Sequence, residues 1–269
     1  MASSDDLDGF LDFAHELADL ASRETVPRFR TQLDVANKVA ADFDPVTDAD
    51  REAERVIRAR IEQRFAQHGI FGEEFGETVG DGRHRWVLDP VDGTRSFICG
   101  APTWTTLIAL EIEGTPRVGV IDQPYTGERW VGTDARTRYF RDGVQRTLMT
   151  SGCVKLEEAR VSTTDPRPGS IFGEVEAAAF SRVAQACRLA RFSMDAYAYA
   201  LLASGQLDLV VEAGLQHYDY AALAPVVRGA GGVVSNWAGG EFDATTGGHL
   251  LASASPELHA AAMAILTRA

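Results

Sequence analysis

The spacing of apolar residues divides this chain into two parts with different patterns. Up to about residue 145, two amphipathic segments are followed by short apolar runs that turn residues separate. Beyond that point strand-like and helix-like segments alternate, which is typical of α/β units. We therefore predict an α+β half over residues 1–145, an α/β half over 146–269, and helices and sheets packed in layers.

Two helices are predicted at the start of the first half. Apolar residues from Leu7 to Ala21 recur every three or four positions, and this stripe ends before Pro27. A second helix is predicted from Thr47–Asp48 to Gly69, where Thr47 and Asp50 have the spacing of a helix cap. An antiparallel sheet is predicted from the four apolar runs that follow: Trp86–Leu88, Thr105–Glu111, Arg117–Asp122 and Glu128–Thr133.

The second half is predicted to alternate between strands and helices. The predicted strands are Arg160–Ser162, Ile171–Phe172, Arg191–Ser193, Asp208–Val211 and Val233–Val234. The predicted helices are Glu174–Cys187, Ala196–Ala203, one that begins near Asp219, and one from about Pro256.

The charge balance excludes two classes of partner. The 269 residues include 39 acidic and 26 basic side chains, for a formal net charge of −13. Nucleic acids and anionic membrane surfaces need basic patches, so we expect neither as a partner. No segment resembles a secretory signal or a membrane span, and the three cysteines have no paired spacing. We expect a cytoplasmic protein.

Acidic residues recur where predicted elements begin or end. The set comprises Asp48, Glu73, Asp89, Asp92 and Asp219. At a helix start a carboxylate is common, which gives Asp48 and Asp219 a purely structural alternative. The segment "DPVDG" at 89–93 has the residues of an ordinary turn, which is the corresponding alternative for Asp89 and Asp92.

Asp89 and Asp92 nevertheless favour a cation site. An apolar run precedes them, so both carboxylates are expected in a partly buried place, where like charges repel unless a cation lies between them. Carboxylate oxygens together with the Val91 carbonyl suit Mg²⁺ better than zinc. None of the six histidines has zinc-site spacing.

A phosphate site is predicted directly after this pair. Gly93 and Thr94 stand where the chain can turn into a short helix. Backbone N–H groups at such a start can hold a phosphate, and glycine allows the backbone to approach it closely. One short stretch would then hold cations and phosphate side by side.

Three motifs resemble those of the inositol monophosphatase superfamily of Mg²⁺-dependent, lithium-sensitive phosphatases. They are "GEE" at 72–74, "DPVDGT" at 89–94 and "YDYAALAPVVRGAGG" at 218–232. The resemblance spans nearly the whole chain and implies a layered αβαβα sandwich. It also implies hydrolysis of a phosphate monoester by a water that the cations activate, with no covalent phosphoenzyme.

The resemblance also implies roles for individual residues. Glu73, Asp89 and the Val91 carbonyl would bind a first Mg²⁺, and Asp89, Asp92 and Asp219 a second. A third, looser ion would also use Glu73, and Mn²⁺ could substitute. Glu73 and Thr94 would orient and deprotonate the water, Asp48 would support Thr94, and the Gly93 and Thr94 amides would hold the phosphate.

The leaving alcohol is expected to contact the second half. Asp195 and Glu212, with Asp92 and Asp219, are the predicted substrate-binding residues, and carboxylates at 195 and 212 suit a cationic amine. Asp195 has a second interpretation, as the N-cap of the helix Ala196–Ala203. The segments 88–110, 195–215 and 218–232 together resemble the histidinol-phosphate phosphatase branch, which implies L-histidinol phosphate as substrate.

Two alternatives stay open. One is an inositol-1-monophosphatase or a broad sugar-phosphate phosphatase, and the other is a non-catalytic sensor of metal or phosphate ligands. The family resemblance further implies a homodimer.

Overall fold

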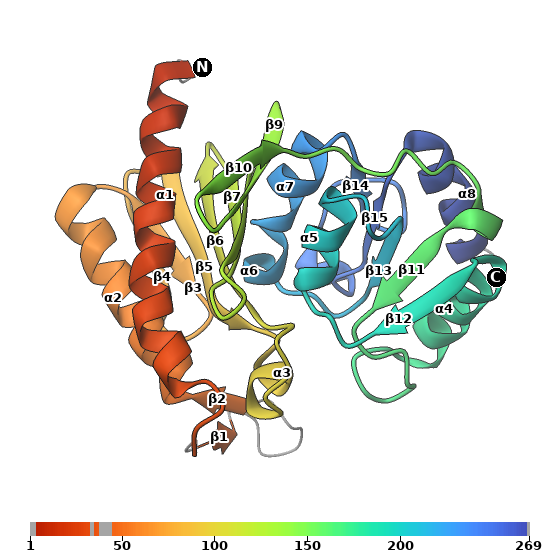
Figure 1. Cartoon of the computed structure of the whole chain (residues 1–269), viewed down its shortest axis with the longest axis horizontal. Coiled ribbons are helices and arrows are strands. Elements are labelled where there is room, and N and C mark those ends of the chain that lie inside the picture. The colour runs from red at the N-terminus through yellow and green to blue at the C-terminus, as the bar shows by residue number, and fades with distance from the viewer. Residues whose placement is uncertain (1–3, 33–34, 38–44, 268–269) are drawn as a thin grey trace.

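The computed structural model describes residues 4–32, 35–37 and 45–267 and forms five layers (Figure 1). The outer helices of the first half are α1 (Ser4–Thr25) and α2 (Asp48–Arg64). Between the sheets lie α5 (Tyr197–Ala203), α6 (His217–Tyr220) and α7 (Leu223–Gly229), and the far side carries α4 (Glu174–Ala186) and α8 (Pro256–Leu266). The αβαβα sandwich is confirmed.

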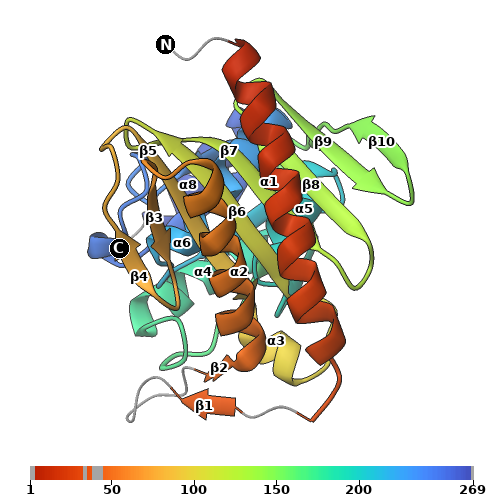
Figure 2. The same cartoon turned by 90° about the vertical axis from the view of Figure 1, so that its left-hand side faces the viewer.

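An eight-stranded sheet forms the second layer, in the order β10-β9-β8-β7-β6-β5-β3-β4. Its strands are β3 (Gly69–Gly72), β4 (Gly76–Thr78), β5 (His84–Asp92), β6 (Thr105–Ile112), β7 (Thr115–Gln123), β8 (Glu128–Thr133), β9 (Arg136–Arg141) and β10 (Val144–Thr147). The four predicted runs pair antiparallel as β5 to β8. In Figure 2, α1 and α2 lie side by side across this sheet.

A five-stranded sheet forms the fourth layer, in the order β12-β11-β13-β15-β14. Its strands are β11 (Arg160–Thr163), β12 (Leu189–Phe192), β13 (Leu209–Glu212), β14 (Val233–Ser235) and β15 (Leu250–Ser253). β11 pairs parallel with β12 and β13, while β15 pairs antiparallel with β13 and β14. The predicted strand Ile171–Phe172 is wrong, because only Phe172 forms a single bridge, to Pro168.

Short elements complete the described chain. β1 (Val35–Asn37) pairs with β2 (Pro45–Thr47), and α3 (Thr94–Ile98) follows β5. Three single turns of 3₁₀ helix cover Val26–Arg28, Leu156–Glu158 and Ala244–Thr246. Within the described residues no helix has the length and apolarity that crossing a bilayer requires.

Alternating side chains of buried strands supply different cores. In β5, Trp86 and Leu88 pack toward α1 and α2, whereas Val87 packs toward the middle helices. In β13, Val210 faces the middle helices, and Leu209 and Val211 face α4 and α8. Because helices cover both faces of each sheet, these strands read as continuous apolar runs.

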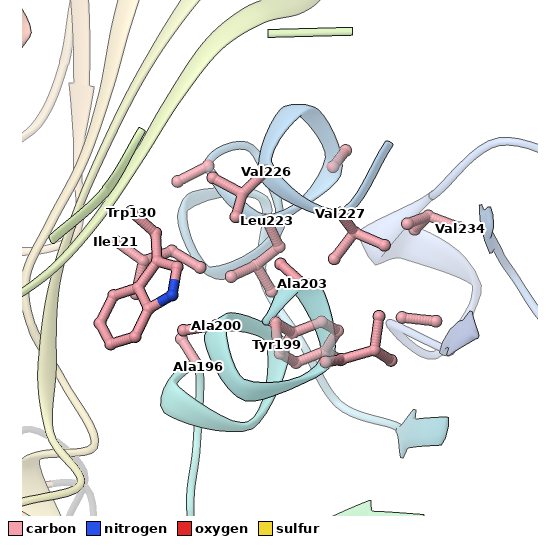
Figure 3. Packing of buried hydrophobic residues seen from close by; sticks show 14 of the residues in the cluster. Ile121, Trp130, Ala196, Tyr199, Ala200, Ala203, Leu223, Val226, Val227 and Val234 are labelled. Atoms are coloured by element: carbon pink, nitrogen blue, oxygen red, sulfur yellow. The ribbon is translucent and has the colours of Figure 1, made fainter. Parts of the chain in front are cut away.

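The middle helix α7 approaches the first sheet very closely. A Cβ on Gly119 would lie 2.2 Å from the Ala222 carbonyl oxygen, and one on Gly132 would lie 2.5 Å from the Val226 Cα. A Cβ on Gly229 would likewise lie 2.2 Å from the Thr133 oxygen. The side chains of α5 and α7 fill the remaining space against the sheet (Figure 3).

Candidate active site

An irregularity in β5 brings Asp89 and Asp92 together. Residues three apart in a regular strand point to opposite faces, but the β5–β6 register shifts between these two aspartates. Asp89 pairs with Leu107 and Asp92 with Thr105. Asp89 is 2% exposed, and the Asp92 carboxylate accepts hydrogen bonds from the Ala196 amide (2.7 Å) and the Thr105 hydroxyl (3.3 Å).

Asp219 reaches this pair from the second half of the chain. It lies in α6, where its carboxylate accepts the Gln216 amide at 2.7 Å in a capping box. One carboxylate oxygen from each of Asp89, Asp92 and Asp219 lies within 4.8 Å of the other two. The structure thus brings together three of the predicted metal ligands.

Glu73 joins the cluster because β3 runs parallel to β5. The register pairs Gly72 with Leu88, so the next residues along the two strands are Glu73 and Asp89. The Glu73 amide donates to the Leu88 carbonyl at 3.1 Å, and the Glu73 charge raises the pKa of Asp89. Glu73 is therefore a fourth acidic side chain at the site.

The assignment of Asp48 is corrected by its position. Asp48 begins α2 with an exposed side chain, whereas Asp50 is 1% exposed and feels the charge of Glu73. The Asp50 carboxylate accepts hydrogen bonds from the Thr47 amide (2.9 Å) and the Thr47 hydroxyl (2.5 Å). The capping spacing of Thr47 and Asp50 was visible in the sequence, but capping alone does not reveal that a carboxylate faces the site.

Crowding of carboxylates raises their pKa values. Burial, followed by repulsion from Glu73, Asp92 and Asp219, raises the pKa of Asp89 well above its usual range. Burial followed by repulsion from Asp195 and Asp219 does the same to the pKa of Asp92. Burial is also the main reason why the pKa rises to about 7 for Asp219 and to about 6 for Asp50.

This donor set fits a hard divalent cation. Among the described residues, no hydrogen-bond partner reaches the buried Oδ1 atoms of Asp89 and Asp50. Buried carboxylate oxygens without partners are unfavourable in the protein alone, but a bound cation would satisfy them. Oxygen ligands of this kind are typical of Mg²⁺ sites.

A second group of side chains, His68, Asp81 and His84, fits a metal less well. The Trp86 indole N–H donates to Nδ1 of His68 at 3.1 Å. Burial lowers the pKa of His68 to about 4, so its ring is neutral near pH 7. A neutral ring that accepts at Nδ1 carries its proton on Nε2, so His68 has no free lone pair for a metal.

The predicted phosphate segment begins α3. Gly93 has φ 79°, a left-handed conformation that glycine adopts without strain, and it precedes Thr94 at the helix start. The Thr94 hydroxyl donates to the carbonyl oxygen of the fully buried Val91 at 3.2 Å. Val91, Gly93 and Thr94 therefore lie between the acidic cluster and the first turn of α3.

Asp195 and Glu212 add two more carboxylates to the site. A cleft of about 180 Å³ is lined by both, together with Asp92 and Asp219. The Asp195 carboxylate accepts the Ser96 hydroxyl at 3.0 Å, and its residue has φ 47°. The N-cap interpretation of Asp195 is wrong, because Ala196 occupies that position and α5 has no side-chain cap.

Glu212 is fixed at the end of β13. Its carboxylate accepts the Thr164 amide (2.7 Å), the Thr164 hydroxyl (2.9 Å) and the Thr163 hydroxyl (3.2 Å). Burial is the main cause that raises the pKa of Glu212 to about 8, and repulsion from Asp195 contributes. A cationic ligand group would relieve this repulsion.

Comparisons with known proteins identify the family. Residues 6–269 match the model of the inositol monophosphatase family. This chain belongs to that family. Its metal-dependent phosphatase chemistry agrees with the acidic cluster described above.

Relatives in the family carry different names. The chain is 42% identical to the chloroplastic bifunctional phosphatase IMPL2 of Arabidopsis thaliana, over 89% of this chain and 68% of that protein. It is 34% identical to a histidinol-phosphatase of Chlorobaculum parvum, over 85% and 86%. The solved inositol monophosphatase of Zymomonas mobilis is 39% identical with a TM-score of 0.85, covering 99% and 100%. Membership of the family therefore does not identify the alcohol that the substrate carries.

Proposed function

We propose that this protein is a Mg²⁺-dependent phosphatase that hydrolyses L-histidinol phosphate to L-histidinol and phosphate. The observation that carries the proposal is the pair Asp195 and Glu212, a half-buried and a buried carboxylate that line the same cleft as Asp92 and Asp219. A cationic group beside Asp195 and Glu212 would favour their ionised forms, so this pair favours an alcohol that carries an ammonium group.

The acidic cluster would hold the cations. Glu73, Asp89 and the Val91 carbonyl are the proposed ligands of one Mg²⁺, and Asp89, Asp92 and Asp219 those of a second. A third ion would share Glu73, and Mn²⁺ is a suitable substitute. When bound, these cations would supply the positive charge that lowers the pKa of the attacking water and stabilises the leaving oxygen.

The chain's own residues would orient and deprotonate the water. We assign Glu73 and Thr94 to this role, with the Gly93 and Thr94 amides positioning the phosphate. Asp50 takes the supporting place first given to Asp48, since Asp50 is the buried α2 carboxylate that faces Glu73. In this proposal the water attacks phosphorus directly and no covalent phosphoenzyme forms.

The leaving alcohol would lie against the second half. Asp195 and Glu212 would accept hydrogen bonds from the substrate ammonium. Hydrogen bonds from Ser96 to Asp195 and from Thr164 to Glu212 hold both acceptors in place before a substrate arrives.

An inositol or sugar phosphate is the second candidate. The solved Zymomonas mobilis relative is called an inositol monophosphatase, and Glu212 could equally accept hydrogen bonds from sugar hydroxyls. A non-catalytic ligand sensor is a third candidate, which Mg²⁺-dependent phosphate release would contradict.

One experiment separates these candidates. Phosphate release is measured on L-histidinol phosphate and inositol 1-phosphate, with Mg²⁺ and with a chelator. We expect Mg²⁺-dependent release with a higher kcat/KM on the amine. Asp195→Ala should lower kcat/KM on the amine by about 10- to 100-fold and leave inositol 1-phosphate nearly unaffected. Equal losses on both substrates would contradict the proposed specificity.

The oligomeric state and cellular location are part of the proposal. We infer a homodimer that acts in the cytoplasm on a small-molecule monoester. Light scattering of the purified protein tests the first statement, and a single-chain mass at micromolar concentration would contradict it.

A further inference from the structure

Tyr199 carries a buried hydroxyl for which the described part of the chain offers no hydrogen-bond partner. Its side chain is 1% exposed, and its ring packs in the cluster between α5 and α7 (Figure 3). Among the described residues, none forms a hydrogen bond with Tyr199 Oη. A buried hydroxyl without a partner is less favourable than the plain ring of phenylalanine, so this tyrosine indicates a partner from outside the chain.

Tyr199 is one of the residues that form the wall of the cleft. Tyr199 lines it together with Asp92, Glu212 and Asp219. The pKa of Tyr199 is raised well above its usual range, mainly by burial and then by the charges of these three carboxylates. The phenol therefore keeps its proton and can act as a donor.

Donors are scarce on this wall. Carboxyl groups apart, only Thr164 and Tyr199 among the described residues that line the cleft have a side chain with a hydrogen-bond donor. The Thr164 hydroxyl already donates to Glu212 at 2.9 Å. Among the described residues of this wall, Tyr199 is then the hydroxyl donor that makes no hydrogen bond within the protein, in a cleft otherwise rich in acceptors.

We propose that Tyr199 is a specificity-determining residue whose hydroxyl donates a hydrogen bond to a neutral acceptor on the leaving alcohol. This inference rests on the proposed function, in which Asp195 and Glu212 bind the ammonium of the same alcohol. The cleft then recognises two features of one molecule, a cationic amine and an uncharged lone pair. An unprotonated imidazole nitrogen is an acceptor of this kind.

Two substrates that differ only in the acceptor test this proposal. L-Histidinol phosphate and L-phenylalaninol phosphate share the amino alcohol phosphate, but phenyl replaces imidazole in the second. For the wild-type protein with Mg²⁺ we expect kcat/KM to be about 10- to 100-fold higher on the imidazole substrate. Tyr199→Phe should remove this difference by lowering only the imidazole value.

A second tyrosine of the same helix supplies the control. The Tyr197 hydroxyl donates to Glu128 at 2.8 Å, away from the residues that line the cleft. Tyr197→Phe should leave the ratio of the two kcat/KM values unchanged. The melting temperature of Tyr199→Phe should not fall, since a hydroxyl without a protein partner is removed.

The possible failures are distinguishable. A wild-type protein that hydrolyses neither amine substrate in Mg²⁺ refutes the proposed function, and this inference with it. A wild-type protein that is active on the amines but whose substrate ratio is the same in Tyr199→Phe refutes only the role of Tyr199. Equal loss on both substrates in that variant also overturns it.

Discussion

At the scale of single residues, Asp89 combines burial, crowding and an unmatched oxygen. It is 2% exposed, lies next to two other aspartates, and its Oδ1 has no hydrogen-bond partner among the described residues. In the metal-free protein the raised pKa of Asp89 means that its carboxyl group keeps a proton, which removes the repulsion from its neighbours. A cation that replaces the proton is therefore bound by a group already positioned for it.

Asp89→Asn should abolish turnover through loss of the metal. A cation contributes several kcal/mol of transition-state stabilisation, so we expect kcat to fall about a thousand-fold or more. Mg²⁺-dependent phosphate release and calorimetric Mg²⁺ titration measure the two effects. Asp134→Asn, at an exposed aspartate that pairs with Arg117 at 3.4 Å, is the matched control and should retain activity. Near-normal turnover of Asp89→Asn would refute the site.

Thr94→Ala separates water positioning from metal binding. The Thr94 hydroxyl donates to the Val91 carbonyl and is not itself a proposed metal ligand. We expect kcat to fall about 100-fold, as for loss of a group that assists proton transfer, with a much smaller change in Mg²⁺ affinity. Parallel kinetics and Mg²⁺ titrations check this, and a loss confined to metal affinity would disagree with the assignment.

At the scale of elements, α2 fixes the loop that carries Glu73. The Glu54 carboxylate is fully buried and accepts the amides of Glu74 (2.8 Å) and Phe75 (3.2 Å). Arg58, one turn later, donates to Glu54 at 2.7 Å. A Cβ on Gly72 would lie 2.0 Å from the same carboxylate, so glycine there allows the close approach.

Glu54→Gln should weaken metal binding although Glu54 is not a ligand. Its amide group would face backbone donors, and Arg58 would lose its buried partner, which typically costs about 3–5 kcal/mol of stability. We expect Mg²⁺ affinity to fall about 10- to 100-fold, as for other groups that orient ligands. Urea unfolding and Mg²⁺ titration measure both effects. Glu52→Gln, at an exposed residue of α2 paired with Arg55, is the control.

A separation of the two effects would be informative in itself. If Glu54→Gln lowered stability but left Mg²⁺ affinity unchanged, the Glu73 loop would hold its conformation without this clamp. Glu54 would then stabilise the fold without any effect on metal binding.

At the scale of the whole molecule, the site lies where the two halves meet. The first half contributes Asp50, Glu73, Asp89 and Asp92, and the second contributes Asp219. The middle helices pack against both sheets and so set the distance between these groups. The fold thereby holds several carboxylates close together at a cost in electrostatic free energy.

This cost predicts an unusual pH dependence for the metal-free protein. The folded pKa values of Asp50, Asp219 and Glu212 are raised to about 6, 7 and 8, so at these three groups the native state binds more protons than the unfolded chain. The free energy of unfolding should therefore fall as pH rises from about 4 to about 8. Urea unfolding in chelator at several pH values tests this.

Mg²⁺ should reverse the trend. Cation binding requires deprotonated carboxylates, so the gain in melting temperature on adding Mg²⁺ should increase over the same pH range. A stability that rises with pH in chelator would show that the cluster is not protonated in the native state.

Some features followed from the sequence because they depend on local physics. Periodicity and the Thr47 cap predicted α1 and α2, and the apolar runs predicted the antiparallel pairing of β5 to β8. The motifs predicted which aspartates form the cluster around Asp89. Such signals lie within a few neighbouring residues, where a side chain and the backbone constrain each other directly.

Other features were decided only by the tertiary structure. The choice of Asp50 over Asp48 depends on which face of α2 meets Glu73, and the orientation of Asp195 depends on Ser96, 99 residues away in the chain. That Tyr199 Oη has no hydrogen-bond partner among the described residues is visible only when its surroundings are in place. Burial and distance between remote segments arise from packing, and no local pattern encodes them.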